Sequence, residues 1–434
     1  MKKTTLSRVL ALTLALLLTL SLAGCGGGNA KSNSLRIYCL NVGSVYGISA
    51  ELNDFKAKNK NLNIEIEAFD DQNTLDERLK TELSAGQGPD VIIGTTYMGL
   101  DVETLASSGS FYDMTAIVEA DTTFTAENYF TQVMKAGIVD GKQYVIPLAF
   151  SVPVFCTSQT VLDDAGIDPD ANVETFYSQL AAYLMSDDEP KISGGYGFSD
   201  TLISLLLSSG SEFWSYQDRT MNLDASADRD LLDLAAAVLR QDAVWVEANP
   251  STRASSELLT ELPVFYANHQ TAPNQIRLLY SAYLAEGRED DFQVVIPSGD
   301  NGYTALVQSF GLVTSTCGNP EAAWSLMRHL MDMEQGYNMY DGVVMNRKNV
   351  EQHLIELTSG DGKRNGDFQI KRLSREIADQ LRNVYAGITD AKIYQYDALS
   401  TEIMQDLSSY ASGETDYDAM VESMTSRINL YINE

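Results

Sequence analysis

The sequence has few of the residues that build disulfide frameworks and metal centres. Its 434 residues include only four cysteines and three histidines. It contains no CxxC pair and no Cys/His cluster with the spacing of zinc ligands. Cys39, Cys156 and Cys317 are widely separated and stand beside apolar residues, which predicts buried free thiols, with one disulfide as the alternative. The sequence therefore predicts neither a metal site nor a bound cofactor.

Positive charge is also scarce. Thirty Lys and Arg residues face sixty Asp and Glu residues, which gives a formal net charge of −30. Such an acidic surface repels the phosphates of nucleic acids and the headgroups of anionic lipids. We therefore expect no nucleic-acid partner and no direct docking on a membrane surface.

Catalytic motifs are missing as well. The chain has no GxSxG, no HExxH and no phosphate-binding glycine loop. The adjacent carboxylates Asp70/Asp71, Asp187/Asp188 and Asp290/Asp291 would point apart on a strand. A glycosidase needs two carboxyl groups from different elements that face one bond. The sequence thus predicts a protein that is not an enzyme, with a glycoside-acting enzyme or a surface adhesin as less favoured alternatives.

Long apolar runs are limited to the start of the chain. A basic start is followed by the apolar segment 9–23, which is short for a bilayer span and ends in small residues. This layout is typical of a secretory signal, with a membrane anchor helix as the alternative. No later segment approaches the length and apolarity of a transmembrane helix.

The end of that apolar segment resembles a bacterial lipobox. Residues 22–25 read LAGC, and the resemblance implies that residues 1–24 are a signal peptide and that Cys25 carries a lipid. A modification of the diacylglycerol type holds a protein firmly on a membrane, because it supplies at least two acyl chains. Residues 25–34 then form a lipidated tether, whose Gly-rich part reaches about 15–18 Å. We expect an exported protein anchored by its lipid on the outer face of the cytoplasmic membrane.

Strand and helix patterns alternate in residues 35–100. Short strands are predicted at 36–40, 64–68 and 91–94, with helices between them that bury Ile48, Leu52 and Phe55 and then Leu75, Leu79 and Leu83. Thr74 and Glu77 have the spacing of a capping box that opens the second helix. This βαβαβ order predicts a parallel sheet covered by helices, which is an α/β fold.

The rest of the chain continues in the same style. Two β-rich runs in 142–158 are interrupted by Pro147 and Pro153. Asn319 and Pro320 have the spacing of an N-cap and a first helical residue. The end of the chain has helical periodicity, and no internal repeat is visible.

Several segments in order resemble one family, the sugar- and oligosaccharide-binding extracellular solute-binding proteins of bacterial ABC transporters, the maltose-binding-protein-like group. After the lipobox, the similar segments are KTELSAGQGPDVIIG (80–94), GKQYVIPLAF (141–150), VFCTSQTVLDDAGID (154–168), GLVTSTCGNPEAAWSLMRHLMD (311–332) and YASGETDYDAMVESMTSRINLYINE (410–434). They cover nearly the whole chain after the tether. Two departures are Thr157-Ser158 in place of Asn-Lys and the lack of Gly-Trp in 263–274.

The resemblance implies a type II periplasmic-binding-protein-like fold of two α/β lobes with a hinge and a ligand cleft between them. With crossovers near Ser151, Ser309 and Val344, one lobe is 35–151 with 309–344 and the other is 152–308 with 345–434. The ligand it implies is a carbohydrate, with a non-sugar solute as the alternative. Its implied partners are the permease subunits of an ABC importer with their cytoplasmic ATPase, and the protein is expected to be a monomer.

A sugar needs aromatic faces for its C–H surface and polar side chains for its hydroxyls. In open α/β sheets these groups follow the carboxyl ends of the strands. We predict that the ligand contacts lie after the first-lobe strands, at the first crossover and in aromatic and polar segments of the second lobe. The predicted ligand-binding residues are Asn41, Ser44, Tyr46, Asp70, Asp71, Thr95, Thr96, Tyr97, Phe150, Ser151, Trp214, Tyr216, Asn268, His269 and Gln270. The alternatives are that Trp214 and Tyr216 cap a core and that Asp70 and Asp71 lie in a solvated turn.

Overall fold

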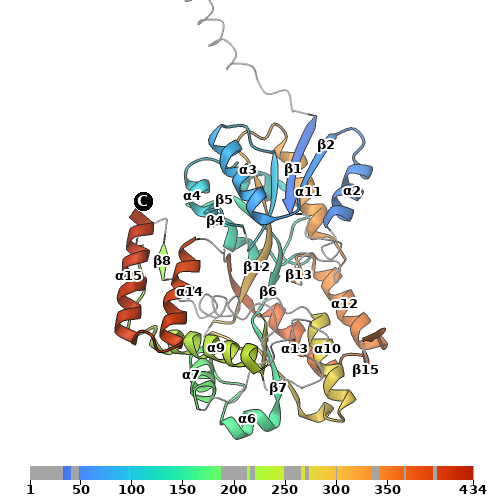
Figure 1. Ribbon diagram of the computed structural model, residues 1–434. Helices are drawn as coiled ribbons and strands as arrows, with labels where there is room; N and C mark the ends of the chain where they lie inside the picture. Colours follow the sequence, from blue (N-terminus) through green and yellow to red (C-terminus); the bar gives the residue numbers. More distant parts are fainter. Residues whose placement is uncertain are drawn as a thin grey trace, which may run out of the picture.

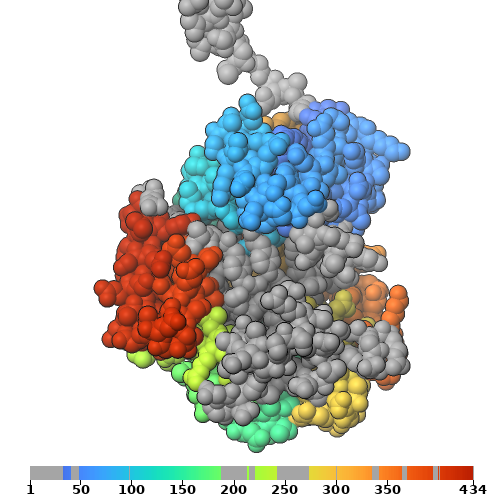
Figure 2. Space-filling view, viewed as in Figure 1, coloured from blue at the N-terminus to red at the C-terminus, as the bar shows by residue number. Residues whose placement is uncertain are grey.

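A computed structural model describes residues 33–433 except 41–47, 97, 187–212, 216–219, 249–264, 269–272, 300, 335–341, 366–367 and 394–397. The described chain forms two α/β lobes, one built around strands β1 and β2 and the other around strand β7 (Figures 1 and 2). Among the described residues, no helix is both long enough and apolar enough to span a membrane.

The first lobe is built on a seven-stranded sheet. Along the sheet the strands are ordered β13 (Val343–Val344), β6 (Val145–Ser151), β12 (Tyr303–Val313), β3 (Val91–Thr95), β1 (Ser34–Leu40) and β2 (Asn63–Phe69), and β16 (Ile388–Ile393) pairs with β12. Its surrounding helices and short elements are α2 (Ile48–Lys58), α3 (Gln72–Ser84), α4 (Val102–Ser107), α5 (Thr115–Ala120), α11 (Pro320–Met331), the 3-10 helix η2 (Thr131–Gly137) and the hairpin β4 (Ile138–Val139) with β5 (Lys142–Gln143).

The second lobe contains a three-stranded sheet and most of the helices. The sheet has the order β10 (Phe265–Asn268), β7 (Val154–Ser158) and β11 (Phe292–Val295). The helices are α6 (Gln159–Ala165), α7 (Val173–Leu184), α9 (Arg229–Ala248), α10 (Pro273–Ala285), η3 (Glu289–Asp291), α12 (Arg347–Ser359), α13 (Arg375–Ala386), α14 (Ala398–Ala411) and α15 (Tyr417–Asn433). Two small hairpins, β8 (Trp214–Ser215) with β9 (Thr220–Met221) and β14 (Arg364–Asn365) with β15 (Phe368–Gln369), complete the described elements.

The predicted βαβαβ start of the chain is confirmed. Strand β1 pairs in parallel with β2 on one side and with β3 on the other. Helices α2 and α3 bury the predicted residues Ile48, Leu52 and Phe55 and then Leu75 and Leu79, while Leu83 is half-buried. Apolar faces at these spacings therefore determine which side of each helix packs on the sheet.

The predicted capping box at Thr74 is wrong. Helix α3 begins at Gln72, and its N-cap is Asp71. One oxygen of Asp71 accepts from the backbone N–H of Thr74 at 2.8 Å, and the other accepts from the Thr74 hydroxyl at 2.6 Å. Because one carboxylate holds both donors of Thr74, the helix starts three residues before the predicted position. At the other predicted cap, Asn319 does accept from the N–H of Ala322 and Pro320 opens α11.

Pro147 does not interrupt its strand, contrary to the prediction. Strand β6 runs through it, between β13 and β12, with Pro147 opposite Phe310. The register of the β6–β12 pair shifts on the Ser309 side of this position. A bulge is a place where a strand accommodates a residue without an N–H, which explains how a proline fits inside the sheet.

The lobes are held by two apolar cores. The larger core surrounds the seven-stranded sheet and continues into α10, α12 and α13, and the smaller core lies among α7, α9, α14 and α15. Cys39, Cys156 and Cys317 are buried free thiols, as predicted. The predicted crossovers fall at the end of β6, within β12 and at β13, and the lobe boundaries they imply stay predictions.

Candidate ligand-binding cleft

The carboxyl ends of β1, β2 and β3 lie at one edge of the large sheet, because the three strands are parallel neighbours. Asp70 and Asp71 directly follow β2, and Thr95 and Thr96 end and follow β3. The structure therefore brings these predicted residues to one edge. Asn41, Ser44 and Tyr46, which follow β1, lie outside the described residues, as do Tyr97, Tyr216, His269, Gln270 and the lipobox residue Cys25.

The two carboxylates after β2 have different environments. Both are exposed, but Asp71 is engaged as the cap of α3. Hydrogen bonds from the Thr74 hydroxyl and then from the backbone lower the pKa of Asp71. Asp70 has no hydrogen-bond partner among the described residues, so of the pair it is the one with both oxygens open to a ligand hydroxyl.

A second group meets where β3, β6 and β12 lie side by side. Thr95 pairs with Ser309 of β12, and the N–H of Thr96 donates to the carbonyl of Gln308 at 3.3 Å. The Gln308 amide donates to the hydroxyl of Ser151, at the end of β6, at 2.7 Å. All of these side chains are buried. Gln308 was not predicted from the sequence, although a glutamine inside the apolar run ALVQSFGLV was a signal for it.

Phe150 lies in an aromatic cluster rather than on an open surface. Its ring is 5.1 Å from that of Phe130 and 6.3 Å from that of Tyr385, in edge-to-face arrangements, and its side chain is 0% exposed. Burial raises the pKa of Tyr385, whose hydroxyl group lies in this apolar surrounding. The cluster thus lies next to the end of β6, and a contact between Phe150 and a ligand stays a prediction.

The predicted residues of the second lobe are only partly described. Trp214 is half-buried in the hairpin β8–β9, where it pairs with Met221 and packs on the core of α7, α9, α14 and α15. Asn268 ends strand β10, opposite Val154 of β7. The positions of these two residues place them on different parts of the second lobe.

Asp76 positions the loop that follows β3. It is a buried carboxylate of α3, which accepts from the Gln72 amide at 2.8 Å and from the backbone N–H of Gly99 at 2.9 Å. Burial raises its pKa, and these hydrogen bonds oppose that shift. A Cβ at position 99 would lie 2.9 Å from an Asp76 oxygen, so the loop fits against Asp76 only because residue 99 is glycine.

Comparison with known proteins identifies the family. A sequence model of the bacterial extracellular solute-binding proteins matches residues 51–359, which is more than half of the chain. The chain belongs to this family. The resemblance stated from the sequence is thereby confirmed. No curated protein sequence matches the chain.

Solved structures share the fold of this solute-binding protein. The sugar-binding protein MalE from Xanthomonas citri aligns with a TM-score of 0.64 and 17% identity, over 92% of this chain and 97% of that one. A family 1 extracellular solute-binding protein from Alicyclobacillus acidocaldarius gives 0.60 and 14%, over 94% and 100%. The galacto-N-biose-/lacto-N-biose I-binding protein from Bifidobacterium longum, in complex with lacto-N-biose, gives 0.59 and 13%, over 93% and 98%. At these identities the likeness establishes the two-lobe fold, as predicted.

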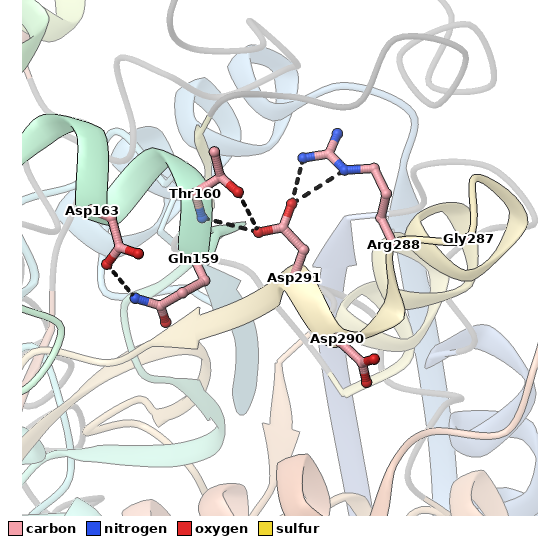
Figure 3. Close-up of a pocket in the computed structure, with 7 residues that line it drawn as sticks. All are labelled: Gln159, Thr160, Asp163, Gly287, Arg288, Asp290 and Asp291. Atoms are coloured by element: carbon pink, nitrogen blue, oxygen red, sulfur yellow. Dashed lines mark hydrogen bonds and ion pairs between the residues drawn. The ribbon is translucent and has the colours of Figure 1, made fainter.

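A pocket on the second lobe of the solute-binding protein lies away from these strand ends. It is lined by the start of α6 and by the turn after α10, with Gln159, Thr160, Asp163, Gly287, Arg288, Asp290 and Asp291 (Figure 3). Asp291 accepts from the N–H of Thr160 at 2.9 Å and from Arg288 at 2.6 Å, whereas Asp290 points away from it. The pair diverges, although it lies in the 3-10 helix η3 and not on a strand, and Asp291 joins α6 to the turn.

One group of side chains has the composition of metal ligands. Glu51 and Asp54 of α2 and His329 of α11 place their ligand atoms within 4.8 Å of one another. The Nζ of Lys58 already lies 2.6 Å from Asp54, and the Nε2 of His329 lies 3.1 Å from the carbonyl oxygen of Glu51. Since each group has a partner within the protein, the contact joins two helices, and we assign no ion to it.

Proposed function

We propose that this chain is a lipid-anchored extracellular solute-binding protein that captures a carbohydrate by hinge closure and delivers it to an ABC import permease. The observation that carries the proposal is the family match over residues 51–359, together with a two-lobe fold shared over more than 90% of the chain with sugar-binding proteins. Hinge closure buries a ligand between two lobes, which suits capture and release rather than bond cleavage. We therefore infer no enzymatic activity.

The carbohydrate class rests on the relatives and on the residues after the strands. Structural neighbours were solved with lacto-N-biose, with cycloalternan and with α-D-tagatose. In this chain Asp70, which follows β2, offers an open carboxylate. Thr95 and Thr96 stand at the end of β3, which is separated from β2 by β1. An open carboxylate at this edge of the sheet matches a ligand rich in O–H donors.

The location rests on the start of the chain. Export follows from the extracellular family, and Cys25 in the LAGC segment is the proposed site of the lipid. Removing the signal cations takes the formal charge from −30 to −33, so an acidic protein needs such an anchor to stay beside an anionic membrane. Replacing Cys25 with serine is expected to move the protein from the membrane fraction to the medium, and unchanged anchoring would contradict the lipid assignment.

A thermal-shift screen of the full chain tests the ligand class. Lacto-N-biose, cycloalternan and α-D-tagatose are the first probes, with amino acids and polyamines as the comparison set. A ligand at a concentration a hundredfold above its Kd adds about 2.7 kcal/mol to the free energy of unfolding. About 400 folded residues have an unfolding entropy of ~0.8 kcal/mol/K, so the melting temperature rises by about 3 °C.

A matched pair of variants locates the site once a probe shifts the melt. Asp70→Asn is expected to weaken the shift, whereas Asp290→Asn, which changes an exposed carboxylate of the second lobe that points away from its neighbour, leaves it intact. A response to amino acids or polyamines alone would replace the carbohydrate assignment and keep the transport role. Turnover of a glycoside, abolished by changing one carboxylate, would overturn both.

A further inference from the structure

Gln308 stands where the longest strand changes its partners. Residues Ser309–Val313 of β12 pair with β3, and residues Tyr303–Val307 pair with β16 of the same sheet. Gln308 lies between these two segments and is 1% exposed. Figure 1 shows β12 and β6 running side by side through the middle of the molecule, between the lobes.

Gln308 is also the extra residue of a β-bulge. In the pairing of β12 with β6, Val307 is opposite Phe150 and Ser309 is opposite Ala149, so no residue of β6 is opposite Gln308. A bulge bends its strand and turns the bulged side chain away from its regular direction. The bend of β12 therefore lies at the residue where the strand passes between its two sets of partners.

Three chain crossings meet at this side chain. The Nε2 of Gln308 donates to the hydroxyl of Ser151 at 2.7 Å, at the end of β6. Gly342, just before β13, is packed so closely that a Cβ there would lie 2.8 Å from the carbonyl oxygen of Phe150 and 3.4 Å from the Cγ of Gln308. The segments near 151, 308 and 342 thus meet at one place, where a buried side-chain hydrogen bond joins the first two and the third packs against them.

The Oε1 of Gln308 is buried and has no hydrogen-bond partner among the described residues. An unpaired buried acceptor is unfavourable compared with the same acceptor paired to a donor. This arrangement of the lobes therefore includes the free-energy cost of one unpaired buried acceptor. An arrangement in which an N–H or O–H reaches Oε1 would not include that cost.

We propose that Gln308 is the pivot of lobe closure, a positioning residue that ties the crossing strands together and disfavours the arrangement seen here through its unpaired Oε1. The proposal rests on the proposed function for its purpose, because closure is what captures a solute. It concerns the free protein, however, and its test contains no sugar. Failure of the carbohydrate assignment therefore leaves it untouched.

The test measures the separation of the lobes directly. Spin labels are attached to cysteines introduced at two exposed positions, Lys80→Cys in α3 and Asp164→Cys in α6, one in each lobe. The full chain is used, with the substitution Cys25→Ser. The native thiols stay unlabelled because they are buried. Pulsed electron–electron double resonance then gives the distribution of distances between the two spin labels. A melting curve is recorded for each variant.

Two variants of the contact have opposite expected effects. The double variant Gln308→Met/Ser151→Ala removes the amide together with its hydroxyl partner and leaves neither group unpaired, so it should favour the arrangement seen here by about tenfold. Ser151→Ala leaves both ends of the amide unpaired and should shift the distribution the other way. The control is Gln143→Met, which removes a buried glutamine whose amide is bonded to the carbonyls of Met134 and Val145 inside the first lobe.

The outcomes separate a pivot from simple packing. Opposite shifts of the distance distribution for the two variants, with none for Gln143→Met, support the proposal. The same distribution in the wild type and both variants, with only the melting temperature changed, overturns it. If the double variant does not fold, Ser151→Ala alone decides, because its distribution either shifts away from the wild-type arrangement or does not.

Discussion

Replacing Phe150 separates a core role from a ligand-binding role. The sequence placed this residue among the sugar contacts, and the structure buries it completely against Phe130 and Tyr385. If its role is packing, Phe150→Ala opens a cavity next to the end of β6 and destabilises the fold. If its ring stacks on a sugar after the lobes move, the same change also removes a binding face.

The size of the effect follows from the burial. A fully buried phenylalanine replaced by alanine costs about 3–5 kcal/mol, because the removed ring leaves a cavity. With ~0.8 kcal/mol/K for about 400 folded residues, the melting temperature falls by roughly 4–6 °C. Phe150→Leu keeps most of the volume and costs about 1.5 kcal/mol or less, which is about 2 °C.

The assay compares stability and affinity in the same two variants. Melting curves without ligand give the cost to the fold, and titration with a probe that shifts the wild-type melt gives the affinity. We expect Phe150→Leu to keep the wild-type affinity, because the leucine fills the space next to the end of β6. A large loss of affinity in Phe150→Leu, with little change in melting temperature, would refute the core role and return Phe150 to the ligand site.

Three further predictions concern the frame around the site. The pKa of Asp121 is lowered from 3.8 to about 2. Partial burial acts to raise this pKa, but hydrogen bonds from Thr123 and Trp324 and the charge of Arg328 outweigh that effect. The contribution of Asp121 to the free energy of unfolding is therefore complete above pH ~4 and is lost as the pH falls toward 2. The urea midpoint of Asp121→Asn should not show this loss, and parallel pH profiles of the urea midpoint for the wild type and the variant would contradict the prediction. Gly137→Ala places a Cβ 1.8 Å from a backbone oxygen and should cost about 1–3 kcal/mol or more in urea unfolding, whereas Gly360→Ala, with open space around it, should be nearly neutral. Burial raises the pKa of Cys39 to about 11, so iodoacetamide should modify it only after unfolding, and rapid labelling of the native protein would contradict its burial.

Local patterns in the sequence determined the first half of the large sheet. Apolar spacing alone located α2, α3 and the three parallel strands, because each pattern reports which face of one element is buried. The start of α3 was misplaced, since two capping signals overlap in DDQNTLDE and sequence spacing does not show which oxygen reaches the free N–H groups. Both oxygens of Asp71, which is also a ligand candidate, accept from Thr74, and a ligand contact at Asp71 stays a prediction.

The crossover could not be derived in this way, because its geometry depends on residues far apart in the chain. Pro147 is compatible with a strand only where the pairing with β12 shifts, and that pairing joins segments about 160 residues apart. Gln308 gave a local signal, a single amide in an apolar run, but its meaning depends on Ser151 and Gly342, which come from two other segments. A polar residue isolated in a buried strand is therefore a place where sequence alone gives little guidance. Burial makes its pairing energetically important, and only the arrangement of several segments determines whether it is paired.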